Sequence, residues 1–156
     1  MSPAFEKVLR PALGHPAQPA SAGGPEHRLD LAVVFTSVEV TLMALRTASA
    51  LAGSLSGRIT LLVPQIVPYP LPLASPPVLL DWNERRFRVM ASESTVDTTV
   101  QMHLCRDRLE TLKAVLSPGS LVVVGGRKRR WWPAPEKRLA RKLRRAGYEV
   151  IFTETE

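Results

Sequence analysis

Hydrophobic runs of two kinds occur along this chain. Three runs are almost continuously apolar, which is typical of strands that are buried on both faces of a sheet: Leu29–Phe35, Ile59–Val63 and Leu121–Val124. Apolar residues alternate with polar ones in Val96–Leu104, and Tyr148–Thr153 is similarly mixed. We therefore expect three central strands and two half-exposed strands at the edges of the sheet.

Helical patterns separate these strands. Thr36 and Glu39 have the spacing of a capping box, and apolar residues at helical spacing follow as far as Gly57, where a left-handed residue would end the helix. A last helix is predicted from Pro135, which suits a first turn, to Gly147.

Two further capping pairs predict the second and third helices. In each pair an aspartate stands three residues before a glutamate, so that the aspartate would cap the helix and the glutamate would reach back. The pairs are Asp81 with Glu84, opening a helix to about Ala91, and Asp107 with Glu110, opening a short helix over Arg108–Leu116. Six prolines in Pro64–Pro77 predict a long loop after the second strand.

Alternation of strands with helices predicts an α/β fold. Because strand–helix–strand crossovers are right-handed, the simplest topology is a doubly wound, five-stranded parallel sheet of order 3-2-1-4-5, with helices on both faces. We expect one such domain over residues 29–156. Residues 1–28 are rich in proline, alanine and glycine, and predict a flexible arm.

The positive charge is local. Lys and Arg exceed Asp and Glu by 21 − 14 = +7, and residues 127–147 contain ten cations and one acid. The rest of the chain is therefore slightly acidic. The ten cations are Arg127, Lys128, Arg129, Arg130, Lys137, Arg138, Arg141, Lys142, Arg144 and Arg145.

A candidate anion site follows from the predicted topology. Ligands of open parallel sheets bind outside the carboxyl ends of the strands, where the strand order reverses, and here that point lies between the first and fourth strands. Two glycines there would let the backbone approach a phosphate or carboxylate that the cations attract. A solvated turn with surplus charge is the alternative. The candidates are Thr36, Ser37, Gly125, Gly126, Arg127 and Lys128.

Two tryptophans directly after four cations suggest a second site. Stacking side chains beside a basic groove are the combination that binds single-stranded nucleic acid. Covering a sheet edge, or lying in a dimer interface, would explain the tryptophans equally. The basic helix could also meet an anionic membrane, but core packing uses its few apolar residues, so we expect no membrane binding. The candidates are Arg129, Arg130, Trp131, Trp132, Arg138 and Arg141.

The sequence contains few residues that indicate redox, metal-binding or catalytic sites. The single cysteine, Cys105, excludes an internal disulfide; Arg106 beside it would favour a reactive thiolate, although we expect a buried residue at a strand end. The three histidines lack metal-ligand spacing, so no metal is predicted. No nucleophile elbow or Walker loop is present, and we expect no enzymatic activity, with nucleotide hydrolysis left to experiment. Without a signal peptide or membrane span, a cytoplasmic location is expected.

The chain resembles the universal stress protein family over about Leu29 to Glu154. The matching segments are LDLAVVFTS before a long helix, RITLLVP with a proline-rich exit, SLVVVGG before a helix, and YEVIFTE. The resemblance implies an α/β fold, a protein that binds ATP or lacks nucleotide, and a homodimer through the last strand, here Tyr148–Thr153.

The resemblance also implies where ATP would bind. In ATP-binding members the first strand ends in an aspartate, and three glycines at set spacing hold the phosphates. This chain has Thr36 at the aspartate position and Gly125 at the first glycine, but Lys128 and Arg138 at the other two. We therefore expect a degenerate ATP site, no cofactor, and a non-catalytic stress-response or regulatory role with another anionic ligand. The alternative is a nucleic-acid-binding module using residues 127–145.

Overall fold

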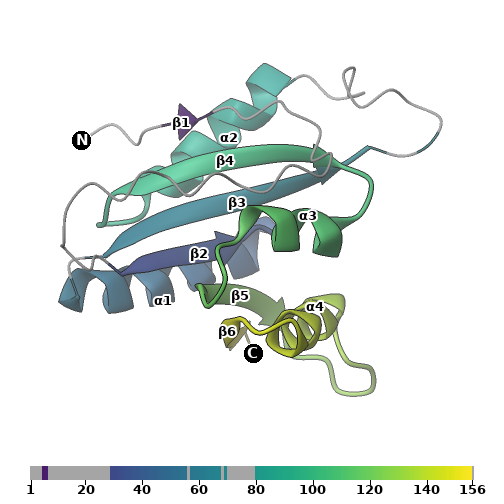
Figure 1. Cartoon of the computed structure of the whole chain (residues 1–156). Coiled ribbons are helices and arrows are strands. Elements are labelled where there is room, and N and C mark those ends of the chain that lie inside the picture. The colour runs from purple at the N-terminus through teal and green to yellow at the C-terminus, as the bar shows by residue number, and fades with distance from the viewer. Residues whose placement is uncertain (1–4, 7–28, 56, 68, 70–79, 156) are drawn as a thin grey trace.

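The computed structural model describes residues 5–6, 29–55, 57–67, 69 and 80–155. Six parallel strands form one sheet in the order β1-β4-β3-β2-β5-β6 (Figure 1). The strands are β1 (Phe5–Glu6), β2 (Asp30–Val34), β3 (Arg58–Ile66), β4 (Thr98–Cys105), β5 (Leu121–Arg127) and β6 (Glu149–Thr155). The helices are α1 (Val38–Ser54), α2 (Leu80–Ser92), α3 (Arg108–Val115) and α4 (Pro135–Arg145).

The predicted order of five strands is confirmed. Strands β4, β3, β2, β5 and β6 are the five predicted ones, in the predicted 3-2-1-4-5 arrangement. The short strand β1, which lies within the predicted arm, pairs with Val100 and Gln101 on the outer side of β4. The remainder of the predicted arm lies outside the described residues, so the arm and the domain boundary at residue 29 stay predictions.

Helices cover both faces of the sheet. On one face α1 and α2 pack on alternate residues of the strands, with Leu31, Val33 and Leu61 among the buried contacts. On the other face α3 and α4 pack on the intervening residues, such as Ala32 and Val34. The predicted doubly wound arrangement is therefore the observed one, and it explains why the central strands are apolar at consecutive positions.

Strand β3 is longer than predicted, and the prediction that Pro64 belongs to the following loop was wrong. Pro64 lies within β3 and is aligned with His103 of β4. On the other side β2 ends at Val34, and the last contact is the bond from Phe35 N–H to Leu62 O, at 2.9 Å. The Pro64 nitrogen, which carries no hydrogen, therefore lies beyond the end of β2. Proline at this position costs no hydrogen bond between β3 and β2. Most of the predicted loop beyond lies outside the described residues.

Strand β4 alternates between buried and half-buried residues only in its first half. From Met102 to Cys105 every residue is buried, so the expectation of a half-exposed strand holds for Thr98–Gln101 alone. Arg106, directly after the strand, donates to Val67 O at 2.7 Å and lies 4.0 Å over the Tyr69 ring. The end of β4 is therefore covered by the segment that leaves β3.

Two of the three predicted caps differ in the structure. Asp107 does cap α3, accepting a 2.9 Å bond from the Glu110 N–H. Helix α1 instead has Ser37 as its N-cap residue, in an extended conformation and without a side-chain capping bond, and the Thr36 hydroxyl donates to Gly125 O. Helix α2 begins at Leu80, so Asp81 is its second residue and not the residue before it.

The glycines that follow α1 and α4 also differ from each other. Gly147 has a φ of 99°, in the left-handed region, and follows α4 where the sequence predicted that helix to end. Gly57 is not left-handed, so that prediction was wrong. A Cβ atom there would lie 2.6 Å from Leu29 O, which shows that Gly57 is needed for the close approach of two backbone segments.

Candidate functional site

The carboxyl ends of β2 and β5 lie side by side, as the predicted switch point requires. At this point the Thr36 hydroxyl donates to Gly125 O at 3.2 Å, and the Thr36 N–H donates to the Thr41 hydroxyl at 3.2 Å. The N–H and the hydroxyl of Thr36 are therefore both bonded within the protein. Ser37, which is half-buried, begins α1.

Gly125 lies against the backbone of α1. A Cβ atom on Gly125 would be 2.1 Å from Val40 O, far closer than atoms can approach. Gly126 faces the other side, where a Cβ atom would be 2.4 Å from the Phe152 ring. Each glycine thus makes room for a neighbouring element of the fold. Thr36, Ser37, Gly125 and Gly126, which we call the switch point, form a packed junction.

Arg127 and Lys128, the next two residues of the chain, also have bonding partners within the protein. The Arg127 guanidinium pairs with the Glu39 carboxylate in the first turn of α1, and both side chains are exposed. The Lys128 N–H donates to Thr155 O at 3.1 Å, which extends the β5–β6 pairing by one residue. The backbone amide of Lys128 is therefore already hydrogen-bonded within the protein.

A basic hollow opens beyond these residues. It has a volume of about 380 Å³ and lies between the loop after β5, the first turns of α4 and the end of β6. Six of its lining residues are cations and one is an acid, Glu154, which pairs with Lys137 at 3.2 Å. The lining residues are Arg127, Lys128, Arg129, Arg130, Trp131, Trp132, Pro133, Ala134, Lys137, Arg141 and Glu154.

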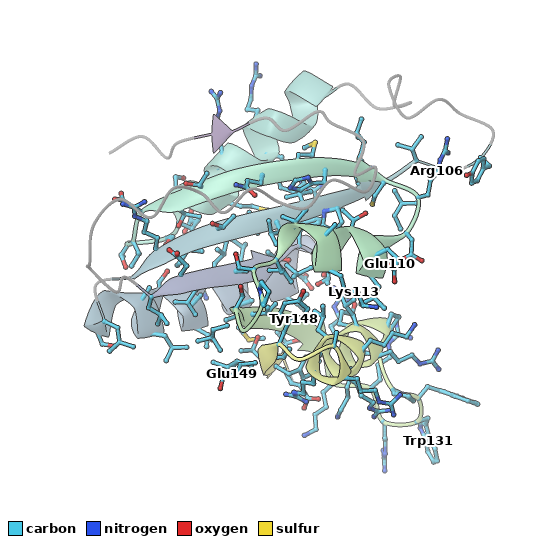
Figure 2. All side chains as sticks on the ribbon, in the orientation of Figure 1. Arg106, Glu110, Lys113, Trp131, Tyr148 and Glu149 are labelled. Atoms are coloured by element: carbon cyan, nitrogen blue, oxygen red, sulfur yellow. The ribbon has the colours of Figure 1, made fainter. Side chains whose placement is uncertain are left out.

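Both tryptophans of the loop are solvent-exposed. Trp131 is 84% exposed and Trp132 is 74% exposed. Figure 2 shows Trp131 at the far end of the loop, directed away from the sheet, and the Arg130 guanidinium lies 5.8 Å from its ring centroid. Within this chain the two tryptophans therefore do not cover the sheet edge, which was one of the alternatives. Large aromatic side chains exposed to solvent are typical of surfaces that bind a ligand or another macromolecule.

The first turns of helix α4 line one side of the basic hollow. Leu139, Ala140 and Leu143 face the sheet and are buried, whereas the opposite side of the helix is basic. Arg141 lines the hollow, but Arg138, the other predicted candidate on this helix, does not. Sequence reasoning missed Lys137 and Glu154 as site residues. Lys137 stands one helical turn before Arg141 and could have been found from that spacing, whereas Glu154 is brought there by the sheet.

Cys105 is buried at the end of β4, as expected. Burial raises the pKa of the Cys105 thiol, and it outweighs the opposing effects of the hydrogen bond with Thr111 and the charge of Arg108. The thiol therefore stays protonated and a poor nucleophile at neutral pH.

Metal-binding clusters and membrane-spanning helices are both absent from the described ranges. No three His, Cys, Asp or Glu side chains gather there closely enough to hold a metal ion. None of the helices described is long and apolar enough to cross a membrane.

Comparison with known proteins gives a match among solved structures. No family model and no curated protein sequence matches this chain. Among solved structures, a protein from the universal stress protein family of Burkholderia pseudomallei superposes with a TM-score of 0.56 and 19% identity, over 83% of this chain and 98% of that one. The resemblance inferred from the sequence is therefore confirmed as a likeness of fold: this chain has the architecture of a universal stress protein.

Proposed function

We propose that this chain is a non-catalytic stress-response or regulatory protein, similar to universal stress proteins, whose degenerate ATP site has been replaced by an anion-binding surface. The observation that carries this proposal is the packed switch point. Thr36 bonds Gly125 O, and α1 lies against Gly125, which supports a crevice closed to nucleotide at the place where the family binds it.

The residues at the family's phosphate-binding positions support the same proposal. In ATP-binding universal stress proteins, glycine amides hold the phosphates, and the second of those glycines corresponds to Lys128. Here the Lys128 N–H bonds Thr155 O, and a side chain at this position would hinder the close backbone approach that glycine allows. The third glycine position is Arg138, on the exposed side of α4. Neither residue can form the amide cradle that discriminates a nucleotide from other anions.

The basic hollow is the better anion site. Six cations face one paired acid, so the local potential is strongly positive. Such attraction is screened by salt and depends little on the base of a nucleotide. We expect ATP, GTP and tripolyphosphate to bind weakly and similarly, in proportion to their charge.

Titration calorimetry with these three anions at physiological salt tests the proposal. Weak binding without preference for adenine is expected, together with no phosphate release from ATP. The Arg129→Glu/Arg130→Glu variant should lose tripolyphosphate binding, and Arg46→Glu, an exposed arginine on α1, is the matched control. Low-micromolar affinity for ATP alone, or ATP turnover, would contradict the proposal.

A homodimer through the open edge of β6 is part of the same proposal. Because Thr155 O bonds β5 and successive strand residues alternate sides, the backbone groups of Val150, Phe152 and Glu154 point outward. The Arg144 guanidinium already donates to Val150 O, at 2.9 Å, so a partner strand would pair beside it or displace it.

Light scattering at high micromolar concentration should give a dimer. Val150→Pro removes an outward N–H without removing a β5–β6 bond, and should yield a folded monomer. A wild-type monomer would remove the dimer from the proposal and leave the anion-binding part intact.

A further inference from the structure

We infer that the basic hollow binds single-stranded nucleic acid, with phosphates on its cations and an unpaired base stacked on Trp131 or Trp132. This inference rests on the part of the proposed function that assigns anion binding to the hollow, and it names the ligand class. Two features of the hollow are needed together: the charge and the exposed rings.

The charge suits a chain of phosphates. The cations do not lie on one element: Arg127 ends β5, Arg129 belongs to the loop, and Arg141 lies on α4. They surround the hollow from several sides. A single small anion would contact only some of them, whereas a polynucleotide backbone presents successive charges along its length. Glu154 repels phosphate less than a free carboxylate would, because Lys137 pairs with it.

The two exposed tryptophans are the second feature, and anion binding by the cations does not account for them. An anion site needs no aromatic side chain, yet two adjacent tryptophans stand exposed among the cations. Any base has a face that can stack on an indole ring, and stacking of this kind tolerates every sequence. Duplex bases are already stacked on one another, so exposed rings of this type favour single strands. Arg130 lies near enough to Trp131 to contact a phosphate beside a stacked base.

An anionic membrane fits the same surface less well. A membrane-binding helix buries an apolar face in the lipid, but the apolar residues of α4 are used in the core. That leaves two tryptophans, and cations around a hollow cannot all contact a flat surface. Free inorganic phosphate would use the cations and leave the tryptophans without a role.

Fluorescence anisotropy with labelled oligothymidylate and oligouridylate tests the inference. If three or four phosphates are neutralised, the slope of log affinity against log salt is about −2 to −3, so affinity falls roughly 20- to 50-fold between 50 and 200 mM salt. A duplex of equal length should bind more weakly than the single strand.

Three variants separate the two features. Trp131→Ala/Trp132→Ala should lower affinity at least about fivefold without changing the salt slope, because only stacking is lost. Arg129→Glu/Arg130→Glu should lower both the affinity and the salt dependence. Arg46→Glu carries the same kind of charge reversal on α1, away from the hollow, and should bind as the wild type does.

Three results would overturn the inference. The first is no oligonucleotide binding at 50 mM salt. The second is binding that the tryptophan variant retains in full, which would indicate a site for phosphate alone. The third is a blue shift of tryptophan fluorescence with phosphatidylserine vesicles and none of these effects with oligonucleotides, which would indicate a membrane site. Selective ATP binding by the wild type would instead contradict the proposed function, so the two failures are distinguishable.

Discussion

The switch point and the basic hollow lie at the same end of the sheet and differ in almost every physical property. At the switch point, Thr36 bonds Gly125 and a helix backbone fills the space beside the glycine. A few residues later the chain leaves the sheet, and six cations and two exposed tryptophans surround a hollow of about 380 Å³. One place is packed protein and the other faces water.

The difference shows that position in an α/β fold does not by itself make a binding site. The carboxyl ends of parallel strands are where ligands usually bind. Here the glycines at that position serve packing: Gly125 admits α1 and Gly126 admits Phe152. The exposed cations lie farther out, in the loop and on α4. A ligand site should therefore be sought where charge and exposure coincide.

Gly125→Ala should have the largest effect on stability. Because the new Cβ atom would lie 2.1 Å from a backbone oxygen of α1, the strand and helix must separate. We expect the free energy of unfolding to fall by about 3 kcal/mol or more. Gly53→Ala is the matched control, since it has open space around it within α1, and helix propensity should raise stability by up to about 1 kcal/mol. Urea denaturation measures both, and a neutral Gly125→Ala would show that the switch point is not packed.

Gly126→Ala should lower the free energy of unfolding by a smaller amount. The nearest atom, 2.4 Å from the new Cβ, belongs to the Phe152 ring, which can shift more easily than a backbone oxygen. We expect a loss of about 1–2 kcal/mol in the same denaturation experiment. A loss as large as that of Gly125→Ala would mean that the ring of Phe152 is held as firmly as the backbone of α1.

Thr36→Val removes the hydrogen bond that joins β2 to β5 at the switch point. Gly125 O would lose its 3.2 Å donor, and we expect the free energy of unfolding to fall by about 1 kcal/mol. Thr60→Val, on β3 and similarly half-buried, is the control with a matched change of side chain. ATP affinity measured by calorimetry should not rise, because α1 still fills the site. A gain in ATP affinity would show that Thr36 alone closes the crevice.

Glu39→Gln should have the smallest effect. It breaks the pair with Arg127, but the side chains are 59% and 71% exposed, so water and salt already screen the attraction. We expect a loss of about 0.5 kcal/mol or less. A double-mutant cycle with Arg127→Gln isolates the pair, and a coupling well above 1 kcal/mol would indicate that Arg127 belongs to the packed junction and not to the hollow.

Local pattern was sufficient for most of the architecture. Continuous apolar runs identified the buried strands, alternation with helices gave the strand order, and Asp107 was recognised as a cap. These features depend on neighbours in sequence, and the sequence contains those neighbours. The charge cluster and the tryptophan pair were visible for the same reason, because all of their residues lie within one short segment.

Tertiary structure decided what each of these residues contacts. The choice of Thr36 as the cap of α1 was wrong because the helix begins one residue later, with Ser37 as its N-cap, while the Thr36 hydroxyl donates across the sheet to Gly125 O. The role of Gly125 depends on Val40, and the amide of Lys128 is used by Thr155. Such contacts join residues far apart in the chain, so no local spacing records them. The sequence by itself therefore determined the fold and the location of the charge, whereas packing between distant segments decided which of the two places is filled by protein and which is exposed to solvent.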